Sequence, residues 1–243
     1  MSPDELRAVN PNNLYLAYHA PRFAVLLRLL AKHARPGRVG GTLLDIGESV
    51  CTPLMGRQQN CTPDSLGLGP DRNRDGGGRH FEFDLHNCQD EARWRRGLPT
   101  YDAVVFAEVI EHLHVAPSLV LRFLRSLLNP GGVLILQTPN ALALHKRLLM
   151  LAGRHPYEKI RENPAIPGHI REYTLDELRD YAAGAGLNEI EVVRESYFDY
   201  RYRFDPRDGH HHHTPRGRWM NTLYRFVPGS MQRGITMVLT NPG

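Results

Sequence analysis

Several features that would assign the chain to a special class are scarce or missing from its 243 residues. Its three cysteines, Cys51, Cys61 and Cys88, are too few and too oddly numbered for a disulfide framework. No stretch reaches the roughly 18 uninterrupted apolar residues of a membrane span, because Arg28 and Lys32 interrupt the most apolar early segment. These absences argue against a disulfide-rich secreted protein and against a membrane-spanning one.

The first residues also lack the pattern of a signal peptide, since Asp4 and Glu5 stand where basic residues would precede an apolar stretch. With 41% hydrophobic and 23% charged residues, the composition is that of a folded domain rather than a disordered chain. The length suits one large α/β domain or two small ones. We therefore expect a cytoplasmic enzyme or binding domain.

Lysine is scarce as well: all but three of the 30 basic residues are arginines, and the formal net charge is +4. The arginines are spread along the chain, which favours a compositional bias over a nucleic-acid surface. Only residues 200–233 are locally basic, with seven arginines against Asp205 and Asp208. The charge therefore favours a small-molecule partner over nucleic acid without excluding the latter.

Hydrophobic periodicity predicts strands that alternate with helices, an order typical of a parallel sheet covered on both faces. Expected strands are 42–46, 66–68, 80–84, 102–107, 133–137, 187–193 and 234–240, and expected helices are 16–33, 119–128, 141–151, 174–183 and 219–226. Thr174 and Glu177 form a capping box at the start of the fourth helix. We expect a single domain over 1–243, with a helical cover (1–37), a core (38–194), an insert (195–233) and a last strand (234–243).

In open α/β sheets, ligands bind beyond the carboxyl ends of the strands, so the residues that end each strand are informative. Neither a P-loop nor a dinucleotide fingerprint is present, because no glycine follows Gly47 closely. Without open backbone amides at that turn, a pyrophosphate has no cradle. A nucleoside ligand without phosphates remains compatible.

Several motifs in order resemble those of class I S-adenosylmethionine-dependent methyltransferases. They are LLDIG (43–47), YDAVVFAEVIEHL (101–113), LLNPGGVLI (127–135), TPN (138–140) and HIREYT (169–174). The resemblance covers roughly residues 16–193. It implies a Rossmann-like, seven-stranded, mostly parallel sheet with an antiparallel last strand, behind an N-terminal helical cover, and S-adenosylmethionine as the cofactor.

The resemblance also implies roles for individual residues. Asp45 and Gly47 would line the methionine and ribose end of the cofactor. Asp84 would accept a hydrogen bond from the adenine amine while Leu85 packs on the ring. Ala107 and Glu108 would bracket the reacting methyl group.

The sequence departs from the family pattern at two places. Gly69, followed by Asp71, stands where an acidic residue usually holds the ribose hydroxyls, and Ser49 and Cys51 stand where glycines are expected. A Cβ in that loop narrows the approach of the cofactor. A methyltransferase-fold protein that binds a partner without catalysis is therefore one alternative.

A second constellation comprises Glu108, Glu111 and His112, whose spacing places them on one face of a helix or tight turn, with His169 in a later loop. It resembles the magnesium site of ubiquinone-pathway O-methyltransferases and small-RNA 2′-O-methyltransferases. A divalent ion such as Mg²⁺ would lower the pKa of an acceptor oxygen. The alternative is a metal-free turn, in which His112 or His169 acts as general base.

We expect O-methylation of a small-molecule, sugar or lipid-linked acceptor, and an RNA 2′-O-methyltransferase is the other enzymatic alternative. The acceptor pocket would be built from the first long helix, residues 137–167 and residues 197–228. On that helix, Tyr15, Tyr18 and His19 are placed either to close over the pocket or to form ordinary surface. The run His210 to His213 is interpreted as a polar loop, with metal capture as the alternative.

Overall fold

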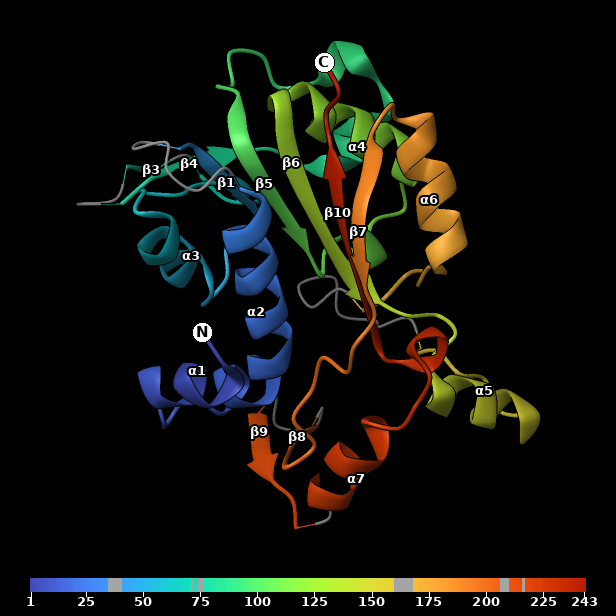
Figure 1. Cartoon of the computed structure of the whole chain (residues 1–243). Coiled ribbons are helices and arrows are strands. Elements are labelled where there is room, and N and C mark those ends of the chain that lie inside the picture. Colours follow the sequence, from blue (N-terminus) through green and yellow to red (C-terminus); the bar gives the residue numbers. More distant parts are fainter. Residues whose placement is uncertain (35–40, 71, 74–76, 160–167, 206–209, 216) are drawn as a thin grey trace.

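A central sheet organises the computed structural model, which describes residues 1–34, 41–70, 72–73, 77–159, 168–205, 210–215 and 217–243 (Figure 1). The strand order is β3-β4-β2-β1-β5-β6-β10-β7. The strands are β1 (Leu43–Ile46), β2 (Asp64–Gly67), β3 (Arg72–Asn73), β4 (Arg79–Glu82), β5 (Tyr101–Ala107), β6 (Leu128–Pro139), β7 (Asn188–Val193) and β10 (Gly234–Thr240).

The expected seven-stranded, mostly parallel, Rossmann-like sheet is confirmed. β1 pairs in parallel with β2 on one side and with β5 on the other, and β10 runs antiparallel to both β6 and β7. The two-residue β3, which the sequence analysis did not predict, adds an eighth strand antiparallel to β4. Because the chain leaves β1 in one direction and returns to β5 in the other, the switch point of the sheet lies between these two strands.

Helices cover both faces of the sheet (Figure 1). They are α1 (Pro3–Val9), α2 (Leu14–His33), α3 (Thr52–Gln59), α4 (Pro117–Ser126), α5 (Leu144–Leu151), α6 (Leu175–Gly184) and α7 (Gly217–Tyr224), with the 3-10 helices η1 (Leu85–Gln89), η2 (Glu91–Arg93), η3 (Ile110–His112) and η4 (Gly229–Met231). The capping box at Thr174 and Glu177 is present and begins α6 one residue later. Among the described residues, no helix is long and apolar enough to cross a membrane.

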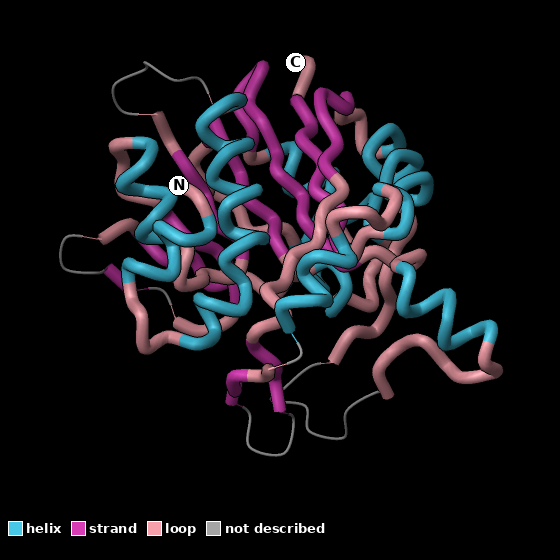
Figure 2. The backbone as a smooth tube through the Cα atoms, turned by 60° about the horizontal axis from the view of Figure 1, so that its bottom comes forward, coloured by secondary structure: helices cyan, strands magenta, loops and turns pink. Residues whose placement is uncertain are grey.

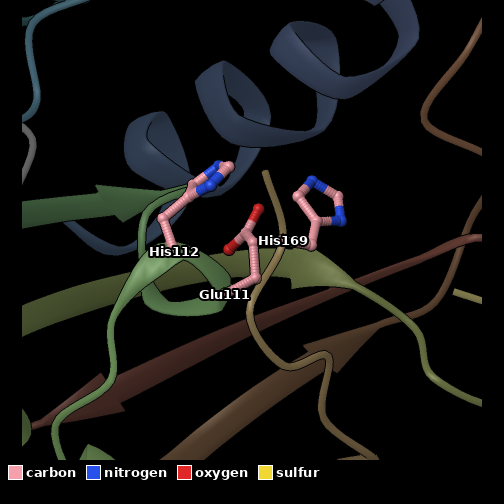
Figure 3. Close-up of side chains that lie close together, drawn as sticks. All are labelled: Glu111, His112 and His169. Carbon is pink, nitrogen blue, oxygen red and sulfur yellow. The ribbon is translucent and has the colours of Figure 1, made fainter. Parts of the chain in front are cut away.

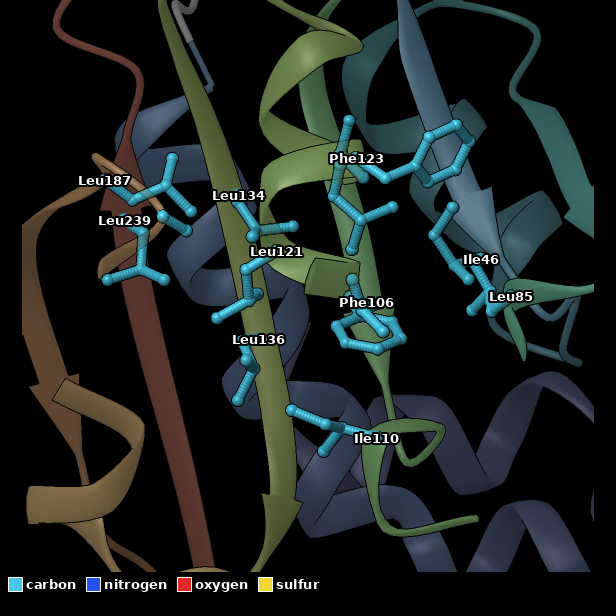
Figure 4. Packing of buried hydrophobic residues seen from close by; sticks show 14 of the residues in the cluster. Ile46, Leu85, Phe106, Ile110, Leu121, Phe123, Leu134, Leu136, Leu187 and Leu239 are labelled. Atoms are coloured by element: carbon cyan, nitrogen blue, oxygen red, sulfur yellow. The ribbon is translucent and has the colours of Figure 1, made fainter. Parts of the chain in front are cut away.

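Side-chain alternation along the strands divides the core into two layers. Ala103 and Val105 of β5 face α2 and α3, whereas Val104 and Phe106 face α4, α6 and η1. Figure 4 shows this second layer, in which Phe106 lies among leucines of β6 and α4. Helices thus shield both faces of the sheet from water, so we expect a ligand to bind at the edge where the strands end.

The insert between β7 and β10 corrects one expectation. His210–His213 is not a polar loop but the strand β9, which pairs antiparallel with β8 (Tyr202–Asp205). The ring of His211 packs against Tyr15 and Tyr18 of α2, and this contact stabilises a conformation that composition alone does not indicate. Figure 1, where arrowheads mark strand direction, shows β8 and β9 at the same end of the molecule as the carboxyl ends of β5 and β6, and Figure 2 shows this pair in magenta at the bottom.

Candidate active site

Most of the predicted site residues lie at or just after the carboxyl ends of β1, β2, β4 and β5, at the lower edge of the sheet in Figure 1. Asp45 is buried at the end of β1, where its carboxylate accepts a 2.5 Å hydrogen bond from the Thr52 hydroxyl at the start of α3. Burial raises the pKa of Asp45 to about 6, although this hydrogen bond opposes the shift. Asp45 therefore carries a negative charge at neutral pH that a cationic ligand would stabilise.

Gly47 makes the turn that follows β1. Its φ of +73° lies in the left-handed region, and a Cβ there would lie 3.3 Å from Cγ2 of Val109. Ser49 and Cys51 occupy the positions in this loop where glycines were expected. The hydroxyl oxygen of Ser49 accepts a hydrogen bond from the backbone amide of Cys51. Burial raises the pKa of the Cys51 thiol to about 12, so this cysteine is no nucleophile at neutral pH.

The end of β2 carries no acidic side chain among the described residues. Gly69 has φ +101° with open space around its Cα, and the preceding Leu68 is 77% exposed. Asp71 lies outside the described residues. Gly69 itself therefore offers no carboxylate that could bind the ribose hydroxyls.

Asp84 and Leu85 follow β4. Asp84 caps η1 by accepting hydrogen bonds from the backbone amide and the ring of His86. Partial burial raises the pKa of Asp84, but these hydrogen bonds outweigh that effect and hold the pKa below its usual value. Leu85 is buried in the same core layer as Phe106 and lies next to Ile46 in Figure 4, and its peptide belongs to the turn that Asp84 stabilises.

Glu108 ends β5 in a strained conformation. Its φ of +56° is unusual for a residue with a side chain, and its amide donates to the Gln137 carbonyl at 2.7 Å. The carboxylate of Glu108 lies 3.4 Å from the guanidinium of Arg22, while Ala107 precedes it in the strand. Burial raises the pKa of Glu108 despite this ion pair.

The sequence analysis missed Arg22, which is 4% exposed and belongs to α2. Its Nε has no hydrogen-bond partner among the residues that the structure describes, and its charge acts on both Asp45 and Glu108. The sequence feature that could have identified it as buried is its position next to Phe23, which belongs to the apolar stripe of the helix. A buried guanidinium at the strand ends is suited to an anionic ligand group.

Three of the four predicted metal ligands come together (Figure 3). One ligand atom each of Glu111, His112 and His169 lies within 4.8 Å of the other two. Glu108 is not part of this group, because its side chain turns toward Arg22. Of the two expected conformations, a helix or a tight turn, the structure has the shorter one, the single 3-10 turn η3 over residues 110–112.

Hydrogen bonds orient the three side chains. Nδ1 of His112 lies 3.0 Å from the Gly168 carbonyl, and Nδ1 of His169 lies 3.0 Å from a carboxylate oxygen of Glu172. Glu111 is fully buried; one of its oxygens accepts a hydrogen bond from the Thr138 hydroxyl, and the other has no partner in the described part of the chain. Burial raises the pKa of Glu111. In each histidine the Nδ1 contact leaves Nε2 as the atom that accepts a proton or binds a metal ion.

A second pair, Glu172 and Lys146, supports His169 and was also missed. The two charged groups are buried in direct contact, and Lys146 donates to the Asn140 carbonyl at 3.0 Å. Burial, together with the nearby charge of Arg233, lowers the pKa of Lys146 to about 7. The lysine therefore holds the Glu172 carboxylate against His169.

A cavity of about 920 Å³ opens beside these groups. Tyr15, Tyr18 and His19 line it, which favours the pocket over ordinary surface, the two alternatives that the sequence left open for them. Its other lining residues are Asn12, Asn13, Leu14, Glu108, Pro139, Glu158, His169, Phe198, His210 and His211. The cavity thus joins an aromatic wall to the carboxylate and imidazole groups at the strand ends.

Comparison with known families agrees with this geometry. The model of a methyltransferase domain family matches residues 17–192, which is most of the chain. The chain belongs to this family. A sequence search of curated proteins finds no match.

Solved structures share the fold of this methyltransferase domain. A SAM-dependent methyltransferase from Archaeoglobus fulgidus superposes with a TM-score of 0.51 at 11% identity, covering 90% of this chain and 94% of that one. One from Mesorhizobium loti gives 0.51 at 13%, covering 87% and 96%. A geranyl diphosphate methyltransferase in complex with SAM gives 0.52 at 12%, covering 90% and 85%. The fold is therefore that of class I SAM-dependent methyltransferases.

Proposed function

We propose that this methyltransferase domain transfers the methyl group of S-adenosylmethionine to a hydroxyl oxygen of a small-molecule acceptor. The observation that carries the proposal is the cavity that joins Glu108 and His169 to an aromatic wall. Cofactor-binding residues, proton-accepting residues and acceptor-binding residues thus share one edge of the sheet.

The cofactor would lie across the ends of β1, β4 and β5. Asp45 and Gly47 would hold its methionine and ribose end, Asp84 and Leu85 its adenine, and Ala107 with Glu108 the region of the methyl group. Gly69 would allow the ribose to approach the backbone at the end of β2, where a side chain is absent. We add Arg22, whose buried guanidinium is suited to the carboxylate of the methionine part.

The acceptor hydroxyl would lose its proton to His169 or His112. His169 has the stronger support, because it lines the cavity and its Nδ1 is held by Glu172. A carboxylate on Nδ1 fixes the ring orientation and stabilises the imidazolium that forms. The resulting alkoxide oxygen then attacks the sulfonium methyl, the bond between that methyl and sulfur breaks, and the cofactor leaves as the neutral thioether; alignment of the two reactants supplies much of the rate.

A divalent ion at Glu111, His112 and His169 is the alternative way to activate the acceptor. The residues fit such an ion, because a buried Glu111 oxygen lacks a partner within the described ranges and both histidines are anchored through Nδ1. When bound, the ion would lower the pKa of an acceptor oxygen. Two imidazoles and one carboxylate favour a borderline ion such as Zn²⁺, and among the harder ions Mn²⁺ over Mg²⁺, which prefers oxygen ligands.

The aromatic wall supports a planar or ring-shaped acceptor. The ring of Tyr18 stacks on Phe198 with 4.8 Å between centroids and lies beside His19 and His211. Burial lowers the pKa of both histidines, so the wall is uncharged at neutral pH. Such a surface binds the face of an aromatic ring or a sugar.

Calorimetry with S-adenosylmethionine tests the proposal. We expect binding, and we expect Asp45→Ala and Asp84→Ala each to weaken it clearly. No binding at millimolar cofactor would instead support a non-catalytic binding protein. Transfer of a labelled methyl group to RNA, with affinity that falls steeply with salt, would support an RNA 2′-O-methyltransferase.

A further inference from the structure

Helix α7 exposes an apolar face that the proposed reaction does not use. Trp219 and Leu223 are one helical turn apart and therefore share a face, and Phe226 follows the helix. Their exposed fractions are 58%, 42% and 81%. Apolar groups of this size seldom gather on a surface that faces only water.

Helix α5 offers a second apolar face at the same end of the molecule, beyond the carboxyl ends of β5 and β6 (Figure 1). Leu148 and Leu151, also one turn apart, are 56% and 84% exposed. Hydrogen bonds join the segments beside the two helices, because Asn140 donates to the carbonyls of Ser230 and Gln232. The relative position of the two faces is therefore held by the fold.

Positive charge predominates beside the face of α7, where four arginines and two acidic residues, Asp4 and Asp199, line one cavity. Residues 217–233 contain three arginines and no acidic residue. Arg218 and Arg225 flank the apolar face of α7 and line a cavity of about 620 Å³ that also includes Arg7 and Arg201. The buried Asp199 pairs with Arg7 and Arg201, whereas neither Arg218 nor Arg225 has an ion pair within the described parts of the chain.

We propose that α7 and α5 together form a docking surface for an anionic lipid bilayer. The docking surface comprises Trp219, Leu223, Phe226, Leu148 and Leu151, with Arg218 and Arg225. Tryptophan, phenylalanine and leucine enter the headgroup boundary, and the arginines bind lipid phosphates in and around the cavity. Charge complementarity distinguishes this partner from a second copy of the chain, whose matching surface would carry the same arginines.

Docking here turns the strand ends, and with them the aromatic-lined cavity, toward the bilayer. An amphiphilic acceptor held in the membrane would then be presented near the site. Membrane docking itself does not rest on the proposed methyl transfer, so its test is independent of activity.

The test is sedimentation of the full chain with vesicles of phosphatidylcholine alone or mixed with phosphatidylglycerol. We expect binding to the anionic vesicles, weaker binding at high salt, and little binding to the neutral ones. In a Trp94→Phe variant, where Trp219 is the remaining tryptophan, its emission shifts to the blue on binding. Failure to bind, equal binding to both vesicles, or an unchanged Trp219 emission would overturn the proposal.

Matched variants separate the contributions. Arg218→Glu with Arg225→Glu weakens anionic binding about tenfold or more, whereas Arg57→Glu with Arg122→Glu, exposed arginines of α3 and α4, has a smaller effect. Leu223→Ser weakens binding more than Ile190→Ser, a residue of similar exposure on β7. Retained circular dichroism confirms folding. A dimer that Trp219→Ser dissociates, without vesicle binding, would assign the surface to a second copy instead.

Discussion

The guanidinium of Arg22 lies 3.4 Å from the carboxylate of Glu108, so that the N-terminal cover helix and the central strand β5 meet in a buried ion pair. Through the charge of Arg22, the N-terminal cover helix α2 can act on a ligand bound at the strand ends. Glu108, held at positive φ, stands beside the place assigned to the reacting methyl group. Strain of this kind persists only where the surrounding structure enforces it.

Replacing Arg22 tests this link. We expect Arg22→Met to weaken S-adenosylmethionine binding about tenfold or more, because a charged hydrogen bond contributes about 1.5–3 kcal/mol. Arg28→Met is the control: Arg28 lies on the same helix but is exposed and pairs with Glu195. Equal loss of affinity in both variants, measured by calorimetry, would reject a direct role for Arg22. Urea unfolding of each variant separates binding from stability.

Asp45→Asn is expected to stabilise the protein while it weakens cofactor binding. The folded pKa of Asp45, about 6, exceeds its unfolded value of 3.8, so the native state loses stability as pH rises between them. Two pKa units correspond to about 3 kcal/mol as an upper bound, and we expect a gain of about 1–3 kcal/mol at pH 7.5. The gain should vanish near pH 4. Urea unfolding at both pH values measures it, and the exposed Asp180→Asn should change little.

Glu172→Gln tests the positioning of His169. We expect kcat to fall while KM for the cofactor stays nearly constant, since Glu172 acts through His169 and lies apart from the residues assigned to the cofactor. Adding Lys146→Met to the Glu172→Gln variant removes the lysine that has lost its ion pair. This double variant should regain stability but not kcat. Glu177→Gln, in the cap of α6, is the control for general destabilisation. A fall in the KM for the cofactor or in the free energy of unfolding, with kcat unchanged, would contradict the positioning role of Glu172.

The metal alternative makes a separate prediction. Mn²⁺ titrated into the chain should bind, as seen by loss of the free-ion electron paramagnetic resonance signal, and Glu111→Gln and His169→Ala should each abolish tight binding. His114→Ala is the control, because His114 stacks on His86 and is outside the cluster. Full activity in excess chelator, together with unchanged activity in Glu111→Gln, would leave the general base as the mechanism.

Apolar strands and capped helices were predictable because local pattern and tertiary burial agree. The last strand was predicted at its observed bounds, 234–240, and the cap at Thr174 was correct. β6 is longer than predicted at both ends, because Leu128 pairs with Tyr101 of β5 and the pairing with β10 continues through Pro139. Neither the positive φ of Glu108 nor the contact between Lys146 and Glu172 has a local signal, since both depend on segments that meet only in the fold.

Gly47→Ala distinguishes backbone strain from a contact with the cofactor. Gly47 and Gly97 have nearly equal φ, +73° and +74°, but a Cβ at Gly47 would meet Val109 whereas one at Gly97 meets nothing within 4 Å. Alanine at either position should cost about 1 kcal/mol of stability, because the left-handed region is unfavourable to a side chain. Only Gly47→Ala should also weaken S-adenosylmethionine binding, since Gly47 alone lies at the switch point of the sheet. Calorimetry and urea unfolding of the two variants, compared side by side, measure both effects; equal cofactor affinity would remove Gly47 from the binding site.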